Sequence, residues 1–241
     1  MKVKVSLLLI LTSVAFYSYS QNSLSIAGDF QTFSSGLQGG VMSSSVTSFK
    51  KKGDVVGSQF LFTDWVKGMI TANSGIQFSD GLFNFDKMGQ KLFVLVSDSG
   101  KTNSFAIDKS QVKSVTLTDG NKSYTFERIP SLNKDQLYIL LAKGPKYSLY
   151  ASVKTTFIAS DYSTNGIVSS GNMYDEYKDE YSYNIVLADG SVHEISLKRK
   201  AIKTFFAADK VKLEEFLKTH DDSSIDEKFL SLLVVYLNQE G

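Results

Sequence analysis

Residues 58–197 form a succession of short apolar segments separated by turn residues, and this pattern limits the fold more than any other feature. The segments are rich in Phe, Tyr, Val, Ile and Thr, which suit a pleated, half-buried surface. Polar and apolar residues alternate in several of them, as they do in strands. The segments are Phe60–Phe62, Val66–Ala72, Leu82–Phe85, Lys91–Ser97, Phe105–Ile107, Val112–Leu117, Tyr124–Ile129, Gln136–Ala142, Tyr147–Ile158, Tyr181–Leu187 and Val192–Leu197.

Residues typical of tight turns lie between these segments, among them the pairs Asp80-Gly81, Asp119-Gly120 and Asp189-Gly190. Asp-Gly pairs tolerate the positive φ angles of tight hairpins. Residues 115–120 and 185–190 have similar sequences, and the reuse of a common hairpin turn explains this more simply than an internal repeat. We therefore predict an antiparallel meander over residues 58–197, in the form of a sheet, a sandwich or a barrel.

The hydrophobic period changes at Lys198, from which point apolar residues recur at helical spacing. We expect Asp209 to cap one helix, and Ser224 with Glu227 to form a capping box for the next. The last helix has an apolar stripe that must be buried, most simply against the β layer. The stripe consists of Phe229, Leu230, Leu233, Tyr236 and Leu237. The expected fold class is α+β, mainly β, with a helical tail over residues 198–241 packed on the β domain.

The first twenty residues have the order of a secretory signal peptide. Lys2 and Lys4 precede an apolar run from Val5 to Phe16, and small residues follow. A spanning helix needs about 20 predominantly apolar residues, and this run is shorter. We expect an exported protein, periplasmic or extracellular, with no transmembrane segment in the mature chain.

We predict cleavage before Gln21, because the apolar run ends at Ser18 and Ser20. N-terminal sequencing or the intact mass of the exported protein checks this prediction. An exported chain that still begins at Met1 would disprove it.

The composition excludes several classes of chemistry. The chain has no cysteine, which excludes disulfides, thiol nucleophiles, cysteine-ligated metals and the lipid-modified cysteine of a bacterial lipoprotein. Removal of residues 1–20 leaves 24 basic against 25 acidic residues. The chain also lacks a basic stripe, so we expect no nucleic-acid partner. Residues 21–57 are rich in Ser and Gly and predict a loosely ordered leader with one strand near Val41–Phe49.

One pattern resembles a family of uncharacterised exported proteins from Bacteroidetes-type bacteria. The stretch Gly57-Ser-Gln-Phe-Leu-Phe-Thr-Asp-Trp-Val-Lys-Gly-Met-Ile70 is similar to that family's "GSPYL…(D)W..G.V" opening, with Gln59 where Pro is usual. Asn73-Ser-Gly75 and Asn84-Phe-Asp86 occupy the places of its turn and its "YN" strand. The helical tail looks like the family's "KK.LL..F" and "YYN" end. The resemblance implies export and this layout, and it implies no activity.

Residues typical of catalytic and metal sites are scarce. There are two histidines: His193 on a predicted strand and His220 at the end of a predicted helix. His193-Glu194 begins a zinc-protease motif, but Leu197 stands where the second His is required. The chain has no nucleophile elbow, no Walker-type loop and no dinucleotide-binding glycine motif. We expect no enzymatic activity and no cofactor or metal.

The run from Tyr174 to Tyr183 has the most unusual local composition, because it consists mainly of acidic residues and tyrosines. Its carboxylates could hold calcium or its tyrosines could stack on a glycan, but it lacks the spacing of a calcium loop. We interpret the run as a solvated loop entering a strand, and the sole tryptophan as a core anchor. The candidate binding-surface residues are Trp65, Tyr174, Asp175, Glu176, Tyr177, Asp179 and Glu180.

These observations predict an exported, non-enzymatic interaction or cell-envelope protein. A β-barrel carrier of a small apolar ligand is the alternative, since aromatic-rich meanders can enclose a cavity. A hydrolase that uses a pair of carboxylates is the second alternative. The expected partner is a protein, a glycan or a small apolar ligand.

Overall fold

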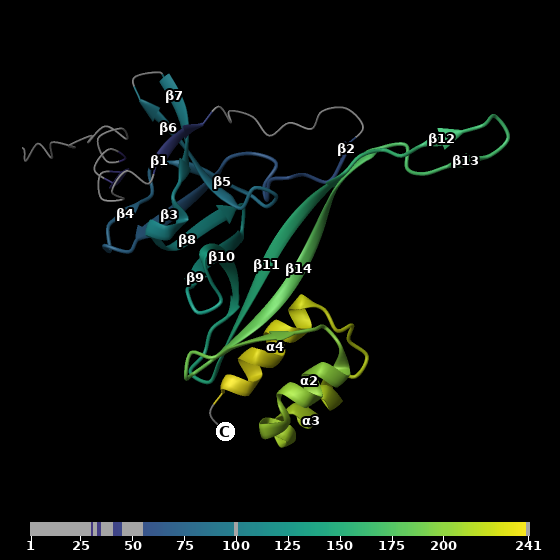
Figure 1. The fold of residues 1–241 in the computed structure, drawn as a ribbon. Helices are drawn as coiled ribbons and strands as arrows, with labels where there is room; N and C mark the ends of the chain where they lie inside the picture. The colour runs from purple at the N-terminus through teal and green to yellow at the C-terminus, as the bar shows by residue number, and fades with distance from the viewer. Residues whose placement is uncertain (1–29, 31–32, 35–40, 45–54, 99–100, 240–241) are drawn as a thin grey trace, which may run out of the picture.

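The computed structural model describes residues 30, 33–34, 41–44, 55–98 and 101–239, and its main element is a 13-stranded sheet (Figure 1). The strands of this sheet are β1 Val41–Ser44, β2 Val55–Val56, β3 Val66–Ala72, β4 Gln77–Phe78, β5 Leu82–Asp86, β6 Lys91–Asp98, β7 Lys101–Ile107, β8 Val112–Asp119, β9 Lys122–Ile129, β10 Asn133–Ala142, β11 Tyr147–Ile158, β14 Asp175–Leu187 and β15 Val192–Ile195. A separate pair consists of β12 Ser163–Thr164 and β13 Ser169–Ser170. The helices are the 3₁₀ turns η1 Lys109–Gln111 and η2 Ala207–Asp209 and the α-helices α2 Arg199–Phe205, α3 Lys210–Thr219 and α4 Glu227–Asn238.

The strand order is β1-β7-β6-β5-β3-β8-β9-β10-β11-β14-β15, with β4 paired to β3 and β2 paired to β14. The pairing of β2 with β14 is parallel, whereas the pairs along the main path are antiparallel. The long ribbon of β11 and β14 runs diagonally between the earlier strands and the three helices (Figure 1). The predicted fold class, mainly β with C-terminal helices packed on an antiparallel sheet, is confirmed.

One predicted strand is wrong. The segment Phe60–Phe62 has only a single bridge, from Phe60 to Asp86. The side chain of Asn84 takes the place of a strand partner, because its Oδ1 accepts from the Phe62 amide at 3.2 Å and its Nδ2 donates to the Phe62 carbonyl at 2.9 Å. Asn84 is fully buried, so these two bonds satisfy an amide that would otherwise be costly to bury.

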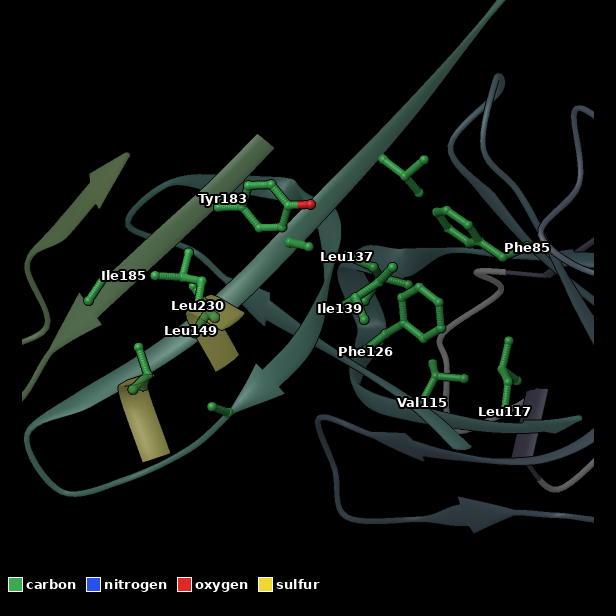
Figure 2. Packing of buried hydrophobic residues seen from close by; sticks show 14 of the residues in the cluster. Phe85, Val115, Leu117, Phe126, Leu137, Ile139, Leu149, Tyr183, Ile185 and Leu230 are labelled. Carbon is green, nitrogen blue, oxygen red and sulfur yellow. The ribbon is translucent and has the colours of Figure 1, made fainter. Parts of the chain in front are cut away.

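One hydrophobic cluster joins the sheet to the helices. It includes Leu117 and Phe126 of the early strands, Leu149 of β11 and Leu230 of α4 (Figure 2). Within the described residues no helix has the length and apolarity needed to cross a bilayer.

The described part of the leader contributes to this core. Phe30 and Phe33 are buried, and their ring centroids lie 5.3 and 5.4 Å from that of Phe78. Strand β1 falls within the range predicted for a leader strand and pairs with β7. The predicted signal peptide, the Ser/Gly stretch 35–40 and the cluster Lys50–Gly53 lie outside the described residues.

Two predicted caps differ from the structure. Helix α4 is capped by Asp226, whose carboxylate accepts from the Phe229 amide at 2.8 Å, and Ser224 instead donates to Asp226. Asp209 precedes α3 without capping it, because its carboxylate accepts from Tyr147 and Lys146 across the fold. At α4 the nearer residue Asp226 takes the capping role expected of Ser224. At α3 the carboxylate of Asp209 bonds to residues that are distant in the sequence and leaves the helix amides without a side-chain cap.

The end of α4 is fixed to the β10–β11 turn by one side chain. The amide of Asn238 donates to the Tyr147 carbonyl at 2.9 Å and accepts from the Lys146 and Tyr147 amides at 2.9 and 3.0 Å. Gly144 lies directly against this amide group, so a Cβ there would overlap it. The turn and the helix end are therefore joined at a point where only glycine fits.

We expect Gly144→Ala to lower the free energy of unfolding by about 1–3 kcal/mol, because it displaces Asn238 and leaves its partners unsatisfied. Urea denaturation measures the change. When Asn238 is already alanine, adding Gly144→Ala should lower the free energy of unfolding by a further amount of less than about 0.5 kcal/mol. If Gly144→Ala is just as destabilising there, the clash with Asn238 is not the cause of the loss.

Candidate functional site

The ribbon of β11 and β14 is the most distinctive feature of the structure. Its register is continuous from the pair Tyr147–Leu187 to the pair Ile158–Glu176. Beyond that point the chain continues into β12 and β13, which lie far from the body of the protein (Figure 1). We call residues 157–176 the distal arm.

The acidic and aromatic run is part of this ribbon, so its interpretation as a loop is wrong. Residues 175–183 all belong to β14. Tyrosine favours strands, and a strand places successive side chains on opposite faces. This alternation separates residues that looked like a cluster in the sequence.

The four carboxylates of the run do not converge. Asp175 and Asp179 lie on one face of β14, about 13 Å apart, and Glu176 and Glu180 lie on the other face. Asp175 accepts from the Ser160 amide at 2.8 Å. In the part of the chain that the structure describes, no three His, Asp or Glu residues form a group that could hold a metal ion.

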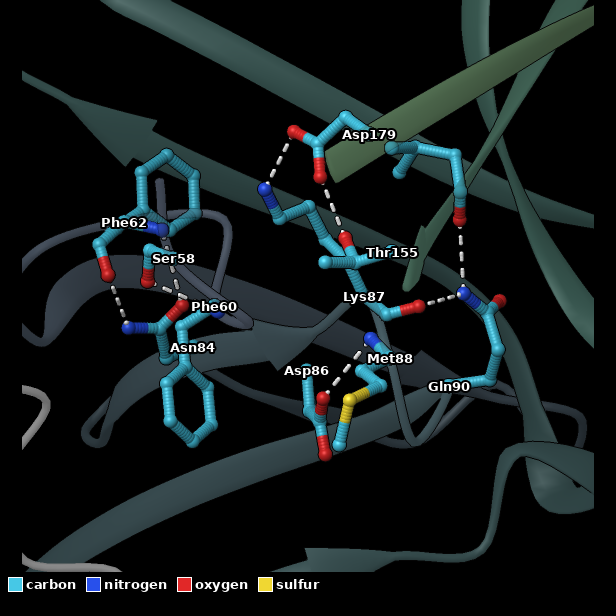
Figure 3. A network of polar contacts seen from close by, with 11 residues as sticks. Ser58, Phe60, Phe62, Asn84, Asp86, Lys87, Met88, Gln90, Thr155 and Asp179 are labelled. Atoms are coloured by element: carbon cyan, nitrogen blue, oxygen red, sulfur yellow. Dashed lines mark hydrogen bonds and ion pairs between the residues drawn. The ribbon is translucent and has the colours of Figure 1, made fainter. Parts of the chain in front are cut away.

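Asp179 has a structural partner on each oxygen. Its Oδ2 lies 2.6 Å from Lys87 Nζ, and its Oδ1 accepts from Thr155 Oγ1 at 2.5 Å (Figure 3). The Lys87 side chain is only 7% exposed. The ion pair therefore joins the β5–β6 turn to the ribbon in the interior.

Further hydrogen bonds fix the same turn on the ribbon (Figure 3). Gln90 donates to the carbonyls of Lys87 and Val153 at 2.6 and 2.8 Å. Asp86 closes the turn by accepting from the amides of Met88 and Gly89. Gln90 has a φ of 52°, so a left-handed residue completes the turn. The network holds two parts of the fold together.

Three further candidates are Tyr177, Trp65 and Tyr174. Tyr177 is half-buried, with its ring centroid 5.1 Å from that of Phe157 and its hydroxyl 3.4 Å from Gln59 Oε1. Trp65 precedes β3 and is half-buried. The core residue at this point of the chain is its neighbour Val66, whereas we expected Trp65 to be buried there. Tyr174 is exposed on the distal arm.

The two histidines occupy separate elements, as predicted. His193 lies on β15 with its ring centroid 5.6 Å from that of Phe205. His220 ends α3 and stacks on Phe216 at 4.1 Å. Both rings make aromatic contacts of the kind that stabilise a fold.

Several strongly exposed apolar side chains gather on the distal arm. Ile167 is 93% exposed, and Met173 is 70% exposed. The exposed apolar and aromatic residues of the distal arm are Phe157, Ile158, Tyr162, Ile167, Val168, Met173 and Tyr174. The Asn165-Gly166 pair, followed by Ile167 and Val168, was the available signal, because Asn-Gly is a strong hairpin turn.

Three buried tyrosines have raised pKa values. Burial and the neighbouring Asp209 raise the pKa of Tyr147, and burial and Glu127 raise that of Tyr150. Burial, with Glu227 nearby, raises the pKa of Tyr183 to about 12. Each hydroxyl donates to its carboxylate, at 2.6, 2.8 and 3.5 Å respectively.

We expect stability to fall as the pH rises above 10. In that range tyrosines of the unfolded chain lose protons while these three keep theirs, so the folded state binds more protons and rising pH favours unfolding. Urea denaturation between pH 8 and about 12 measures the slope. Tyr→Phe at 147, 150 and 183 together should flatten it, and an unchanged slope in that variant would assign the loss to other groups.

No family model matches the chain, and neither a curated protein nor a solved structure is similar to it.

Proposed function

We propose that this protein is an exported, non-enzymatic interaction module of the cell envelope that binds a partner protein through its distal arm. The observation that carries the proposal is the group of exposed apolar residues at the end of a ribbon that extends from the body. Exposed apolar side chains that gather in one part of a protein surface mark interaction sites.

The energetics favour a protein partner. Burial of one large apolar side chain contributes about 1.5–3 kcal/mol, and the arm offers Ile167, Val168 and Met173 together. Tyr162 and Tyr174 flank them, and tyrosines are common at the centres of interfaces. An isolated two-stranded hairpin is marginally stable. A partner that packs on both strands would stabilise the arm as well as bury its apolar side chains.

The location of the proposed interaction follows from the N-terminal sequence. A chain with the signal-peptide pattern of residues 1–20 meets its partners outside the cytoplasm. The absence of cysteine means that no disulfide cross-links the arm, so its order depends on hydrogen bonds and packing.

The test is a purification of the exported chain together with its partner from the envelope. We expect Ile167→Asp combined with Met173→Asp to abolish co-purification of the partner while the melting temperature is unchanged. Val211→Asp is the matched control, because Val211 is 82% exposed on α3. Loss of the partner from the Val211 variant as well, or its retention by the arm variant, would contradict the proposal.

A further inference from the structure

A second, separate feature is a pocket of about 440 Å³ between the body, β14 and the start of α4. Ligand sites of small molecules have volumes of this order. Tyr124 of β9, Tyr181 and Tyr183 of β14, Leu141 of β10, Lys122 and Glu227 line it. Tyr183 is among the labelled residues of Figure 2. The pocket thus combines aromatic rings, an aliphatic wall and two opposite charges.

The fold holds the aromatic lining in place. The Tyr124 ring packs edge-on against Phe62 with centroids 5.4 Å apart, and Lys122 Nζ lies 4.5 Å from the centre of the Tyr124 ring. The Tyr183 hydroxyl points to Glu227 Oε2 at 3.5 Å. Tyr181 is 47% exposed, so its ring is accessible to a ligand.

The charges of the lining define the class of ligand. Lys122 and Glu227 give the lining a formal charge of zero, which favours a ligand without net charge. Both hydrogen-bond donors and acceptors are present, in the lysine, the carboxylate and the tyrosine hydroxyls. A purely apolar ligand would cover these groups without replacing their bonds to water, which is costly.

We propose that this pocket binds a neutral saccharide. A sugar ring has hydroxyl groups that both donate and accept, and C–H faces that pack on tyrosine rings. The proposal does not depend on the distal arm, because the pocket and the arm share no lining residue.

The test is saturation-transfer NMR and calorimetry on the whole mature chain with glucose, galactose, N-acetylglucosamine and their disaccharides. We expect millimolar binding of at least one of these sugars. Tyr181→Ala should weaken that binding about tenfold, because it removes one stacking contact between the sugar and a tyrosine ring. Tyr162→Ala is the control, because Tyr162 is a similarly exposed tyrosine on the distal arm, and it should bind the sugar as the unmodified chain does.

Two results would overturn the proposal. One is the absence of saturable binding for all of these sugars, and the other is an equal loss of sugar affinity in the Tyr181 and Tyr162 variants. Binding of a fluorescent fatty acid in the pocket, blocked by Tyr181→Ala, with no sugar binding would identify an apolar-ligand site instead. The melting temperature of Tyr181→Ala, expected to be unchanged, separates loss of the site from loss of the fold.

Discussion

Replacing Leu233 by aspartate should unfold the whole chain, and not only the helix that carries it. Leu233 is 0% exposed and belongs to the cluster that joins α4 to the strands. Removing a buried leucine costs about 2–5 kcal/mol, and burying an unpaired carboxylate adds to that loss. The sum is comparable to the total stability of a typical domain, about 5–15 kcal/mol. Circular dichroism during thermal unfolding measures the effect.

Leu232→Asp is the matched control. It makes the same chemical change one residue earlier on α4, where the side chain is 45% exposed. We expect a loss below about 0.5 kcal/mol for this variant. If the helical signal of Leu233→Asp is lost while the β signal still melts at its original temperature, the helical tail is an independent module. That result would refute the claim that the tail and the sheet unfold as one unit.

Asp179→Ala should be the second most damaging change. It leaves the Lys87 ammonium buried without its partner, and breaking a buried pair from one side costs about 3–5 kcal/mol. The side chain of Asp179 is itself 28% exposed, so we expect a value near the lower end of this range. Urea denaturation measures the loss.

The control for this change is Glu180→Ala, because Glu180 is exposed on the opposite face of β14. We expect almost no loss there. Lys87→Met combined with Asp179→Ala should recover much of the stability, since the uncompensated charge is gone. A double variant as unstable as Asp179→Ala would show that the ion pair is not the cause.

The strands were predictable because their signal is local. The ranges predicted for β3 and β11 agree with the structure to the residue, since period-two alternation and flanking turns determine them. The stripe of α4 was predictable for the same reason, and its five residues are buried or packed against the core.

What the sequence did not reveal depends on contacts between distant residues. Lys87 and Asp179 are 92 positions apart, and so are Lys146 and Asn238. No local pattern predicts which carboxylate meets which lysine, so Asp179 was a candidate for the surface and Asp209 a candidate cap. The pocket was equally unpredictable, because its tyrosines come from β9 and β14, two strands that only the fold brings together.

The central proposal is that the distal arm binds a partner outside the cytoplasm. The most direct measurement is photo-crosslinking in living cells, with a photoreactive residue at Val168 of the exported chain. We expect one specific adduct with a partner protein, absent when Ile167 is replaced by aspartate and absent when the probe is placed at Val211. No adduct from position 168, or the same adduct from position 211, would contradict it.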